Sequence, residues 1–170
     1  VMTSSDHLET LAQTLEATGD YRVIRRLKPR PRTAPPPGTP LRLGLVVDVE
    51  TTGLDPQRHE IIELAMTPFN YGLDGTVFSV GDIFQGLRQP SEPIAAEITA
   101  ITGITNEMVA GQIIDPAAVA TFAAPASLVI AHNAAFDRRF LERFSDVFLM
   151  KPWACSLSQI DWAAEGFEGT

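Results

Sequence analysis

The sequence contains one cysteine, Cys155, among 170 residues, so it cannot form an internal disulfide. This is typical of a reducing compartment, and we expect a cytoplasmic location. The sequence also lacks a long apolar segment, because its longest apolar stretch, residues 116–131, is interrupted by Pro125 and small polar residues. That stretch is too short and too broken to cross a membrane. Residues 1–11 carry acidic side chains and no basic start, so we expect neither a signal peptide nor a membrane partner.

Positive charge is scarce, with 13 Lys and Arg against 21 Asp and Glu. The imbalance is uneven along the chain. Residues 1–43 hold seven Lys and Arg and four Asp and Glu, a net charge of +3, whereas residues 44–170 hold six and seventeen, a net charge of −11. An acidic domain is not expected to bind duplex DNA through charge alone. It could still accept nucleic acid if metal ions bridged its carboxylates to phosphate groups.

Composition divides the chain into three parts. Residues 1–28 are predicted to form a small appendage, with a helix at 5–17 and a short strand at 21–27. Residues 29–41 are rich in proline and read as a semi-extended linker, and residues 42–170 form the main domain. The arginine-rich arm has two interpretations, a solvated tether or an appendage that contacts phosphate groups.

Apolar periodicity and turn residues predict an α/β main domain. Three strands joined by short turns indicate an antiparallel meander, and later strand–helix units indicate parallel strands. We therefore expect a mixed sheet flanked by helices, with ligands bound at the strand ends. The predicted strands are 43–49, 60–69, 75–87, 127–131 and 153–156, and the predicted helices are 93–100, 106–110, one from 115, 134–144 and 157–164.

Two carboxylates stand at the end of the first predicted strand. Asp48 and Glu50 are two residues apart, so their side chains project from the same face of the strand. Neighbouring anions repel, and burial makes them costly, so the pair indicates a divalent metal site. The next residues, Thr51-Thr52-Gly53, have turn chemistry and leave the pair at a lip. Glu63, in the second strand, has two interpretations, a third metal ligand or a hydrogen-bonded structural carboxylate, and we favour the second.

A third carboxylate lies in the predicted helix 134–144. At about 100° per residue, Asp137 falls in the middle of an apolar arc that includes Phe140 and Leu141. A charged residue in such an arc needs a partner or a metal ion. Three carboxylates suit Mg²⁺ or Mn²⁺, and no Cys and His set has the spacing of a zinc site. Two such ions about 4 Å apart support phosphodiester hydrolysis.

Two segments resemble the motifs of a known family. Residues 48–53, Asp-Val-Glu-Thr-Thr-Gly, resemble the first motif of the DEDD 3′–5′ exonucleases. Residues 132–137, His-Asn-Ala-Ala-Phe-Asp, resemble the second, in the DEDDh form of the epsilon proofreading subunit of bacterial DNA polymerase III. Residues 102–105, Thr-Gly-Ile-Thr, resemble the loop between these motifs. The resemblance covers roughly residues 43–162.

The resemblance implies an RNase H-like fold and a metal-dependent 3′–5′ exonuclease that releases nucleoside 5′-monophosphates. It implies that Asp48, Glu50 and Asp137 are catalytic and ligate two Mg²⁺ or Mn²⁺ ions. The implied partner is a single-stranded 3′ end, of DNA rather than RNA, with a DNA polymerase as a candidate partner in proofreading or repair. Phe136 also has a plainer interpretation as a core residue. The implied substrate-binding residues are Thr51, Thr52, Gly53, Leu54, His132, Asn133 and Phe136.

The family's third motif, His-x-Ala-x-x-Asp, has no match in this sequence. That motif supplies the general base and a fourth metal-binding aspartate. After Asp137 the remaining aspartates are Asp146 and Asp161, and no histidine follows His132, which we interpret as a wall of the site. No general base is therefore assigned. Our hypothesis is that the chain is a truncated form of a longer exonuclease, which binds metal weakly and cuts poorly.

Three other functions fit part of the pattern. A phosphatase with an aspartyl nucleophile also places an acidic pair after an apolar strand, but Glu50 is one methylene too long for it and the second motif stays unexplained. A nucleic-acid-binding or regulatory module with the nuclease fold and no catalysis agrees with the missing third motif and the basic arm. Among nucleases, a repair or RNA-trimming enzyme shares the same motifs with a polymerase proofreader.

Overall fold

The computed structural model describes residues 4–24 and 33–167. The chain divides into two compact units, Val1–Pro31 and Arg32–Thr170. Among the described residues, no helix is long and apolar enough to span a membrane. In chain order the elements are α1 (Ser4–Ala17), β1 (Leu41–Thr51), β2 (Ile61–Gly72), β3 (Val77–Val80), β4 (Phe84–Leu87), α2 (Ala96–Thr102), α3 (Asn106–Val109), α4 (Pro116–Ala123), β5 (Leu128–Ala131), α5 (Ala134–Phe144), the 3₁₀ helix η1 (Asp146–Phe148), β6 (Trp153–Cys155) and α6 (Ser156–Gln159).

The first unit contains α1, which confirms the helix predicted at 5–17. The helix is followed by Gly19, whose φ of 78° is the left-handed conformation that glycine adopts easily after a helix. Residues 21–24 are described without regular structure, and the rest of the strand predicted at 21–27 lies outside the described residues. Most of the predicted linker, residues 33–40, has no strand or helix. The three-part division stays a prediction.

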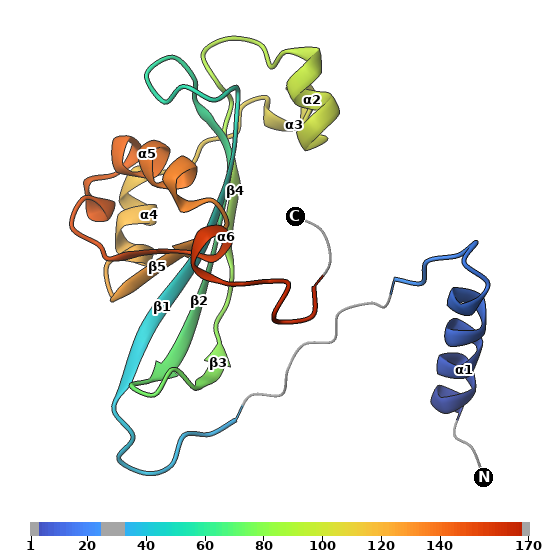
Figure 1. Cartoon of the computed structure of the whole chain (residues 1–170). Coiled ribbons are helices and arrows are strands. Elements are labelled where there is room, and N and C mark those ends of the chain that lie inside the picture. The colour runs from blue at the N-terminus through green and yellow to red at the C-terminus, as the bar shows by residue number, and fades with distance from the viewer. Residues whose placement is uncertain (1–3, 25–32, 168–170) are drawn as a thin grey trace. The chain divides into compact units, whose positions relative to one another are not determined.

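The second unit is built on a six-stranded mixed sheet, with the order β3-β2-β1-β5-β6 and β4 paired with β2 (Figure 1). β1 and β2 pair antiparallel along their length, whereas β1–β5 and β5–β6 are parallel. This architecture confirms the predicted mixed α/β sheet with an antiparallel meander. Because β1 and β5 are parallel, the C-terminal ends of both strands lie at the same end of the sheet.

The prediction of a single third strand at 75–87 was wrong in its number of strands. The segment forms two strands, because β3 pairs with β2 from Phe69 onward and β4 pairs with residues 63–66 of β2. Pro68 of β2 lies opposite the break. Proline has no backbone N–H, so it cannot continue the ladder of hydrogen bonds. Its carbonyl instead accepts a hydrogen bond from the N–H of Gly81 at 2.8 Å.

Two predicted helices also have different bounds. The helix expected at 93–100 begins only at Ala96, because the Asn106 side chain holds the backbone of Ile94 through bonds of 2.8 and 3.2 Å. The helix expected at 157–164 is the short α6, which ends before Ile160. There the indole N–H of Trp162 donates to the carbonyl of Ser156 at 2.8 Å and turns the chain back.

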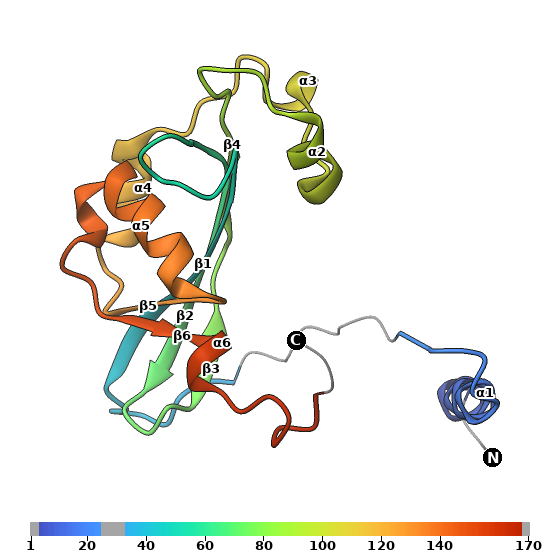
Figure 2. The ribbon, with the colours of Figure 1, turned by 45° about the horizontal axis from the view of Figure 1, so that its top comes forward.

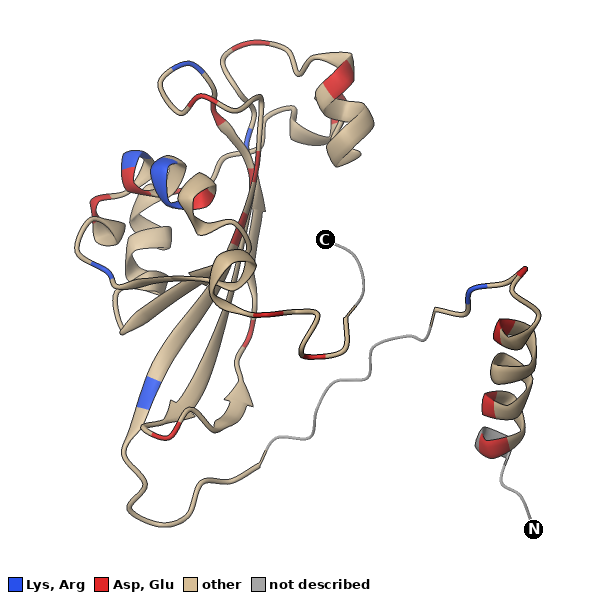
Figure 3. Cartoon of the chain, viewed as in Figure 1, with Lys and Arg blue, Asp and Glu red and all other residues tan. Residues whose placement is uncertain are grey.

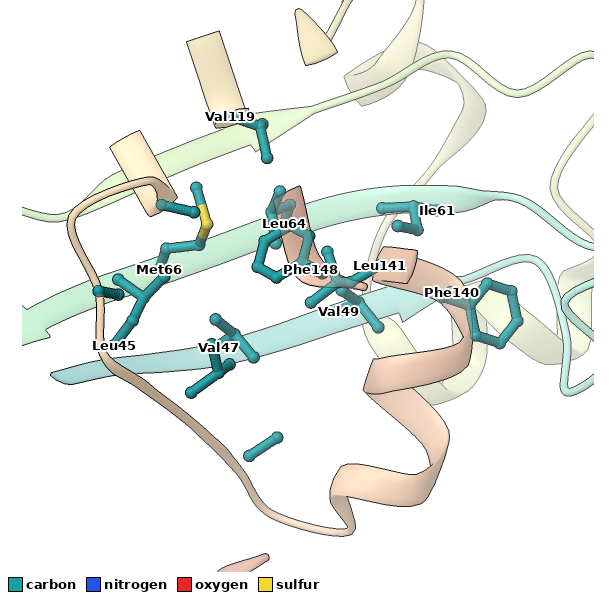
Figure 4. Close-up of a cluster of buried hydrophobic side chains, with 14 of the residues drawn as sticks. Leu45, Val47, Val49, Ile61, Leu64, Met66, Val119, Phe140, Leu141 and Phe148 are labelled. Carbon is teal, nitrogen blue, oxygen red and sulfur yellow. The ribbon is translucent and has the colours of Figure 1, made fainter. Parts of the chain in front are cut away.

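The main core lies between the sheet and the helices α4, α5 and η1, which cover one face (Figures 1 and 2). Alternate residues of β1 and β2 point into this layer, and Phe148 and Leu141, both 0% exposed, pack over them (Figure 4). A smaller cluster of Ile62, Ile94, Ile104 and Val109 anchors the segment that carries α2 and α3. Packing of its buried side chains in the main core fixes α5 over the end of β1.

Candidate functional site

The alternation of β1 places its two carboxylates on the open face of the sheet. Leu45, Val47 and Val49 are at most 5% exposed and face the core, whereas Asp48 is exposed and Glu50 is half-buried. Asp48 pairs with Ala65 and Glu50 pairs with Glu63 across the β1–β2 ladder. The predicted position of Asp48 and Glu50 at a lip agrees with this geometry.

Glu63 adds a carboxylate to the same face. Its Oε1 accepts a hydrogen bond from the Gln85 side chain of β4 at 2.9 Å. This contact is consistent with the structural role predicted for Glu63. The carboxylate still acts on its neighbours, because its charge helps to raise the pKa of both Asp48 and Glu50.

Asp137 reaches the end of β1 from the first turn of α5. It is 3% exposed, as its place in the apolar arc of the helix predicts. Its Oδ1 accepts a hydrogen bond from the backbone N–H of Val49 at 3.1 Å. The last parallel pair between β1 and β5 is Val46 with Ile130, so the Val49 N–H lies beyond the ladder and needs another acceptor. Asp137 supplies that acceptor, and the residue that it binds, Val49, is the neighbour of both Asp48 and Glu50 in the sequence.

The three carboxylates act on one another electrostatically. Burial is the main cause that raises the pKa of Glu50, and the charge of Asp48 is the second. Burial raises the pKa of Asp137 to about 6, and the charges of Asp48 and Glu50 push it in the same direction. Burial and the charge of Glu63 raise the pKa of Asp48, which the nearby His132 opposes. A divalent cation would relieve this repulsion.

Across residues 4–24 and 33–167, no three His, Cys, Asp or Glu side chains are arranged so that they could hold a metal ion as they stand. One oxygen of Asp137 already accepts the N–H of Val49, and the carboxylates of Asp48 and Glu50 repel each other. The donor chemistry nonetheless fits Mg²⁺ or Mn²⁺, because three mutually repelling carboxylates meet at one strand end and hard cations prefer oxygen ligands. Asp48, Glu50 and Asp137 are the residues that would hold such ions.

The turn after β1 is tightly tied. Thr51 is 7% exposed, and its hydroxyl donates to the Gly53 carbonyl at 2.7 Å. Thr52 pairs with Glu60, because its N–H donates to the Glu60 carbonyl at 2.9 Å and its hydroxyl accepts the Glu60 N–H at 3.0 Å. Leu54 projects outward and is 78% exposed. The turn is thus a rigid base with an exposed apolar tip.

His59 organises this turn, and sequence reasoning missed it. Its Nδ1 accepts the N–H of Asp55 at 3.0 Å. Its ring lies so close to Gly53 that a Cβ there would be 2.6 Å from ring atoms. A Cβ at position 53 would therefore force the His59 ring to move. No spacing in the sequence links His59 to Gly53, because the contact closes only when the loop folds back.

The second motif lies where β5 passes into α5. His132 is exposed, and its Nδ1 is 3.1 Å from the Ser156 hydroxyl. Asn133 precedes the helix with a φ of 66°, a left-handed conformation that asparagine tolerates. Phe136 packs against the main core, with its ring centroid 5.0 Å from that of Phe140. The structure thus brings His132 near Asp48 but places Phe136 in packing.

Cys155, at the end of β6, is a second residue that the sequence did not single out for chemistry. Its Sγ accepts the N–H of Ala134 at 3.4 Å, and a hydrogen bond with Ser158 is the main cause that lowers the pKa of the thiol to about 7. It lies beside the second motif and fixes the start of α5.

The sequence matches the family model of the RNase_T exonucleases over residues 45–164. The chain belongs to the RNase_T exonuclease family. Its relatives include the PolC-type DNA polymerase III of Thermotoga maritima, which is 34% identical over 120 residues, or 69% of this chain and 8% of that protein. The epsilon-like protein of DNA polymerase III from Rhodobacter capsulatus is 37% identical over 106 residues, or 58% of this chain and 14% of that protein. The chain therefore spans only a small part of the length of these two relatives.

Solved exonucleases share the fold. Exonuclease X in complex with 5′ overhanging duplex DNA superposes with a TM-score of 0.51 at 26% identity, over 75% of this chain and 68% of that one. Escherichia coli exonuclease I in complex with a 5cy-dA13 oligonucleotide has a TM-score of 0.54 at 19% identity, over 68% of this chain and 28% of that one. The RNase_T chain thus has the RNase H-like exonuclease fold that its motifs implied.

Proposed function

We propose that this exonuclease domain hydrolyses phosphodiester bonds at nucleic-acid 3′ ends and releases nucleoside 5′-monophosphates. The observation that carries the proposal is the meeting of Asp48, Glu50 and Asp137 at the end of β1. Asp137 accepts a hydrogen bond from Val49, the residue that separates Asp48 from Glu50 in the sequence. The charges of Asp48 and Glu50 both raise the pKa of Asp137.

The three carboxylates are proposed as the catalytic metal ligands. Two bound Mg²⁺ or Mn²⁺ ions would activate a water molecule and stabilise the leaving oxygen. Asp48 and Glu50 offer their oxygens from the open face of the sheet. Asp137 is held in place by its hydrogen bond to Val49, and its second oxygen would be its metal ligand.

The terminal nucleotide is proposed to bind at the turn after β1. Thr51, Thr52 and Gly53 form its rigid floor through the hydroxyl bonds to Gly53 and Glu60. The exposed side chain of Leu54 offers an apolar contact to a base. His132 forms a wall beside Asp48.

Asn133 and Phe136 complete the proposed substrate pocket in different ways. Asn133 is exposed at the start of α5 and can meet the nucleotide directly. Phe136 is half-buried against the core, so it supports the shape of the pocket from behind.

We expect slow cleavage by these 170 residues alone. They provide three of the four carboxylates of the resembled motif set, and no histidine follows His132 as a general base. A single-stranded DNA 3′ end is the proposed substrate, in keeping with the oligonucleotide complex of exonuclease I and the DNA complex of exonuclease X. A DNA polymerase partner and a cytoplasmic location are proposed from the DNA polymerase III relatives.

The test is a Mn²⁺-dependent digestion of one oligonucleotide, labelled in separate samples at its 5′ or 3′ end. We expect slow release of a labelled mononucleotide from the 3′-labelled sample and a ladder from the 5′-labelled one. Asp48→Asn should abolish both. Glu97→Gln, which removes an exposed carboxylate from α2, is the matched control and should leave them unchanged.

Other outcomes would favour other functions. Endonucleolytic fragments, or digestion that survives Asp48→Asn, would contradict the proposed chemistry. Tight binding of 3′ ends without turnover would favour the non-catalytic binding module. Rapid digestion by the 170-residue chain would contradict the expectation that its active site is incomplete.

A further inference from the structure

Most of the few basic residues between positions 44 and 170 gather in one region. Residues 44–170 carry six Lys and Arg, and five of them lie in the β1–β2 loop, just after β4 and on α5 (Figure 3). The remaining one, Lys151, is engaged with the carbonyls of Ala124 and Ala126 at 2.6 and 2.7 Å. In a domain with an excess of acidic residues, this clustering is the main local source of positive potential.

Three of these residues line a single cleft of about 480 Å³. Arg58 comes from the β1–β2 loop, Arg88 follows β4 and Arg143 comes from the last turn of α5. We call this the arginine cleft. His59 and Gln57 line it as well, and Phe140 and Phe144 give it an apolar wall.

Two of the three guanidinium groups form no ion pair with a carboxylate in the described part of the chain. Arg88 is neutralised by Glu60, the only acidic residue in the lining, at 2.8 Å. Arg143 donates to the neutral amide of Gln57 at 2.7 Å. The guanidinium of Arg58 has no hydrogen bond or ion pair with any of the residues that the structure describes. The cleft therefore presents two uncompensated positive charges that suit a phosphate group or two.

The apolar wall adds a second kind of contact. The guanidinium of Arg88 lies 6.0 Å from the centroid of the Phe144 ring. Phe144 is half-buried, so part of its ring remains accessible from the cleft. Cationic groups next to aromatic rings are typical of grooves that follow a single nucleic-acid strand.

The arginine cleft lies next to the proposed active site. Thr51 pairs with Ile61, and Thr52 is bonded to Glu60, so the floor of the proposed nucleotide pocket and the wall of the cleft are the two sides of one β1–β2 ladder. Arg143 follows Asp137 by six residues of the same helix, which corresponds to roughly 9 Å along its axis. Because Asp48 and Glu50 lie on the open face of the sheet and α5 covers the other face, a strand held at the carboxylates would reach the cleft by passing around the end of β1 and the β1–β2 loop.

We propose that the arginine cleft binds backbone phosphates of the nucleic-acid strand whose 3′ end occupies the carboxylate site. The proposal rests on the proposed function for the direction of the strand. It assigns to Arg58 and Arg143 the phosphate contacts and to Phe144 a contact with a base or sugar. The cleft would then favour strands that are long enough to span both places.

The test measures binding by fluorescence anisotropy in EDTA, so that metal-dependent contacts do not contribute. The probes are a fluorescein-labelled single-stranded dodecamer and a trinucleotide of DNA. Arg58→Gln and Arg143→Gln together should weaken dodecamer binding and leave trinucleotide binding nearly unchanged. Losing two phosphate contacts should make the negative slope of log K against log salt less steep by about 1.4. This corresponds to about a sevenfold change in the ratio of the affinities at 50 and 200 mM salt.

Arg139→Gln is the matched control. It removes the same charge from the same helix, but Arg139 donates to the carbonyl of Ala135 and does not line the cleft. Arg58→Gln alone guards against misfolding, because that guanidinium has no partner in the described part of the chain to lose. It should make the negative slope less steep by about 0.7.

Several results would overturn the proposal. Equal losses in Arg139→Gln and in the cleft variants would reduce the effect to net charge. An unchanged slope in the double variant, or no binding of the dodecamer by the wild-type chain, would also refute it. Equal competition by a polyglutamate of matched charge would show that the cleft binds acidic peptide. The digestion assay fails or succeeds independently of all these results, since it is measured on the metal-dependent reaction.

Discussion

Removing the charge of Asp137 should stabilise the fold in the absence of metal. Burial and the neighbouring Asp48 and Glu50 raise the pKa of Asp137 to about 6 from the ordinary 3.8. This difference corresponds to at most about 3 kcal/mol, and solvent screening of the exposed Asp48 and the half-buried Glu50 reduces it to about 1–2 kcal/mol. Asp137→Asn removes the repulsion but keeps an oxygen that can accept the N–H of Val49.

The advantage of Asp137→Asn should depend on pH. Since the folded state holds the Asp137 proton more tightly than the unfolded state, the wild type loses stability as the pH rises from about 4 to about 6. The variant lacks this loss. Its advantage is therefore absent below that window, grows through it and stays constant at about 1–2 kcal/mol above it.

Asp137→Ala separates charge from hydrogen bonding. It also removes the repulsion, but it leaves the Val49 N–H without an acceptor, which costs about 1–3 kcal/mol. It should therefore be less stable than Asp137→Asn at every pH.

Urea unfolding in EDTA, followed by tryptophan fluorescence at about pH 4 and about pH 8, measures these differences. Glu97→Gln, which changes an exposed carboxylate, controls for net charge. If Asp137→Asn were less stable than the wild type at the higher pH, or had the same effect at both, the electrostatic reasoning would be refuted.

Three further predictions concern the frame of the site. Gly53→Ala should lower the free energy of unfolding by about 1–3 kcal/mol, because its Cβ would overlap the His59 ring; an unchanged urea midpoint would contradict the close approach. Asn133→Gly should be nearly neutral in the same assay and Asn133→Val should cost about 1–2 kcal/mol, because φ is 66°; equal stability of the two variants would argue against the left-handed start of α5. Phe148→Ala should cost about 3–5 kcal/mol as a fully buried core residue, and a cost below about 1 kcal/mol would place it outside the core.

The parts of the site that depend on local periodicity could be predicted from sequence. The helix predicted at 134–144 has the bounds of α5, and the 3.6-residue period placed Asp137 in the buried arc where it lies. The two-residue period of β1 likewise put Asp48 and Glu50 on one face. Periodicity sufficed because each of these positions is decided within a single element.

Features that join distant segments could not be predicted. The break between β3 and β4 depends on Pro68 in a neighbouring strand, and the role of His59 depends on a loop that folds back onto Gly53. The arginine cleft is assembled from three segments with no common spacing. The acceptor for the Val49 N–H was likewise hidden, because it follows from where β5 stops pairing with β1.

A Mn²⁺ titration followed by electron paramagnetic resonance tests the central claim most directly, that Asp48, Glu50 and Asp137 form one metal site. We predict saturable binding that weakens by about tenfold or more in each of Asp48→Asn, Glu50→Gln and Asp137→Asn and that is unchanged in Glu97→Gln. Equal Mn²⁺ affinity in the wild type and all four variants would contradict the claim.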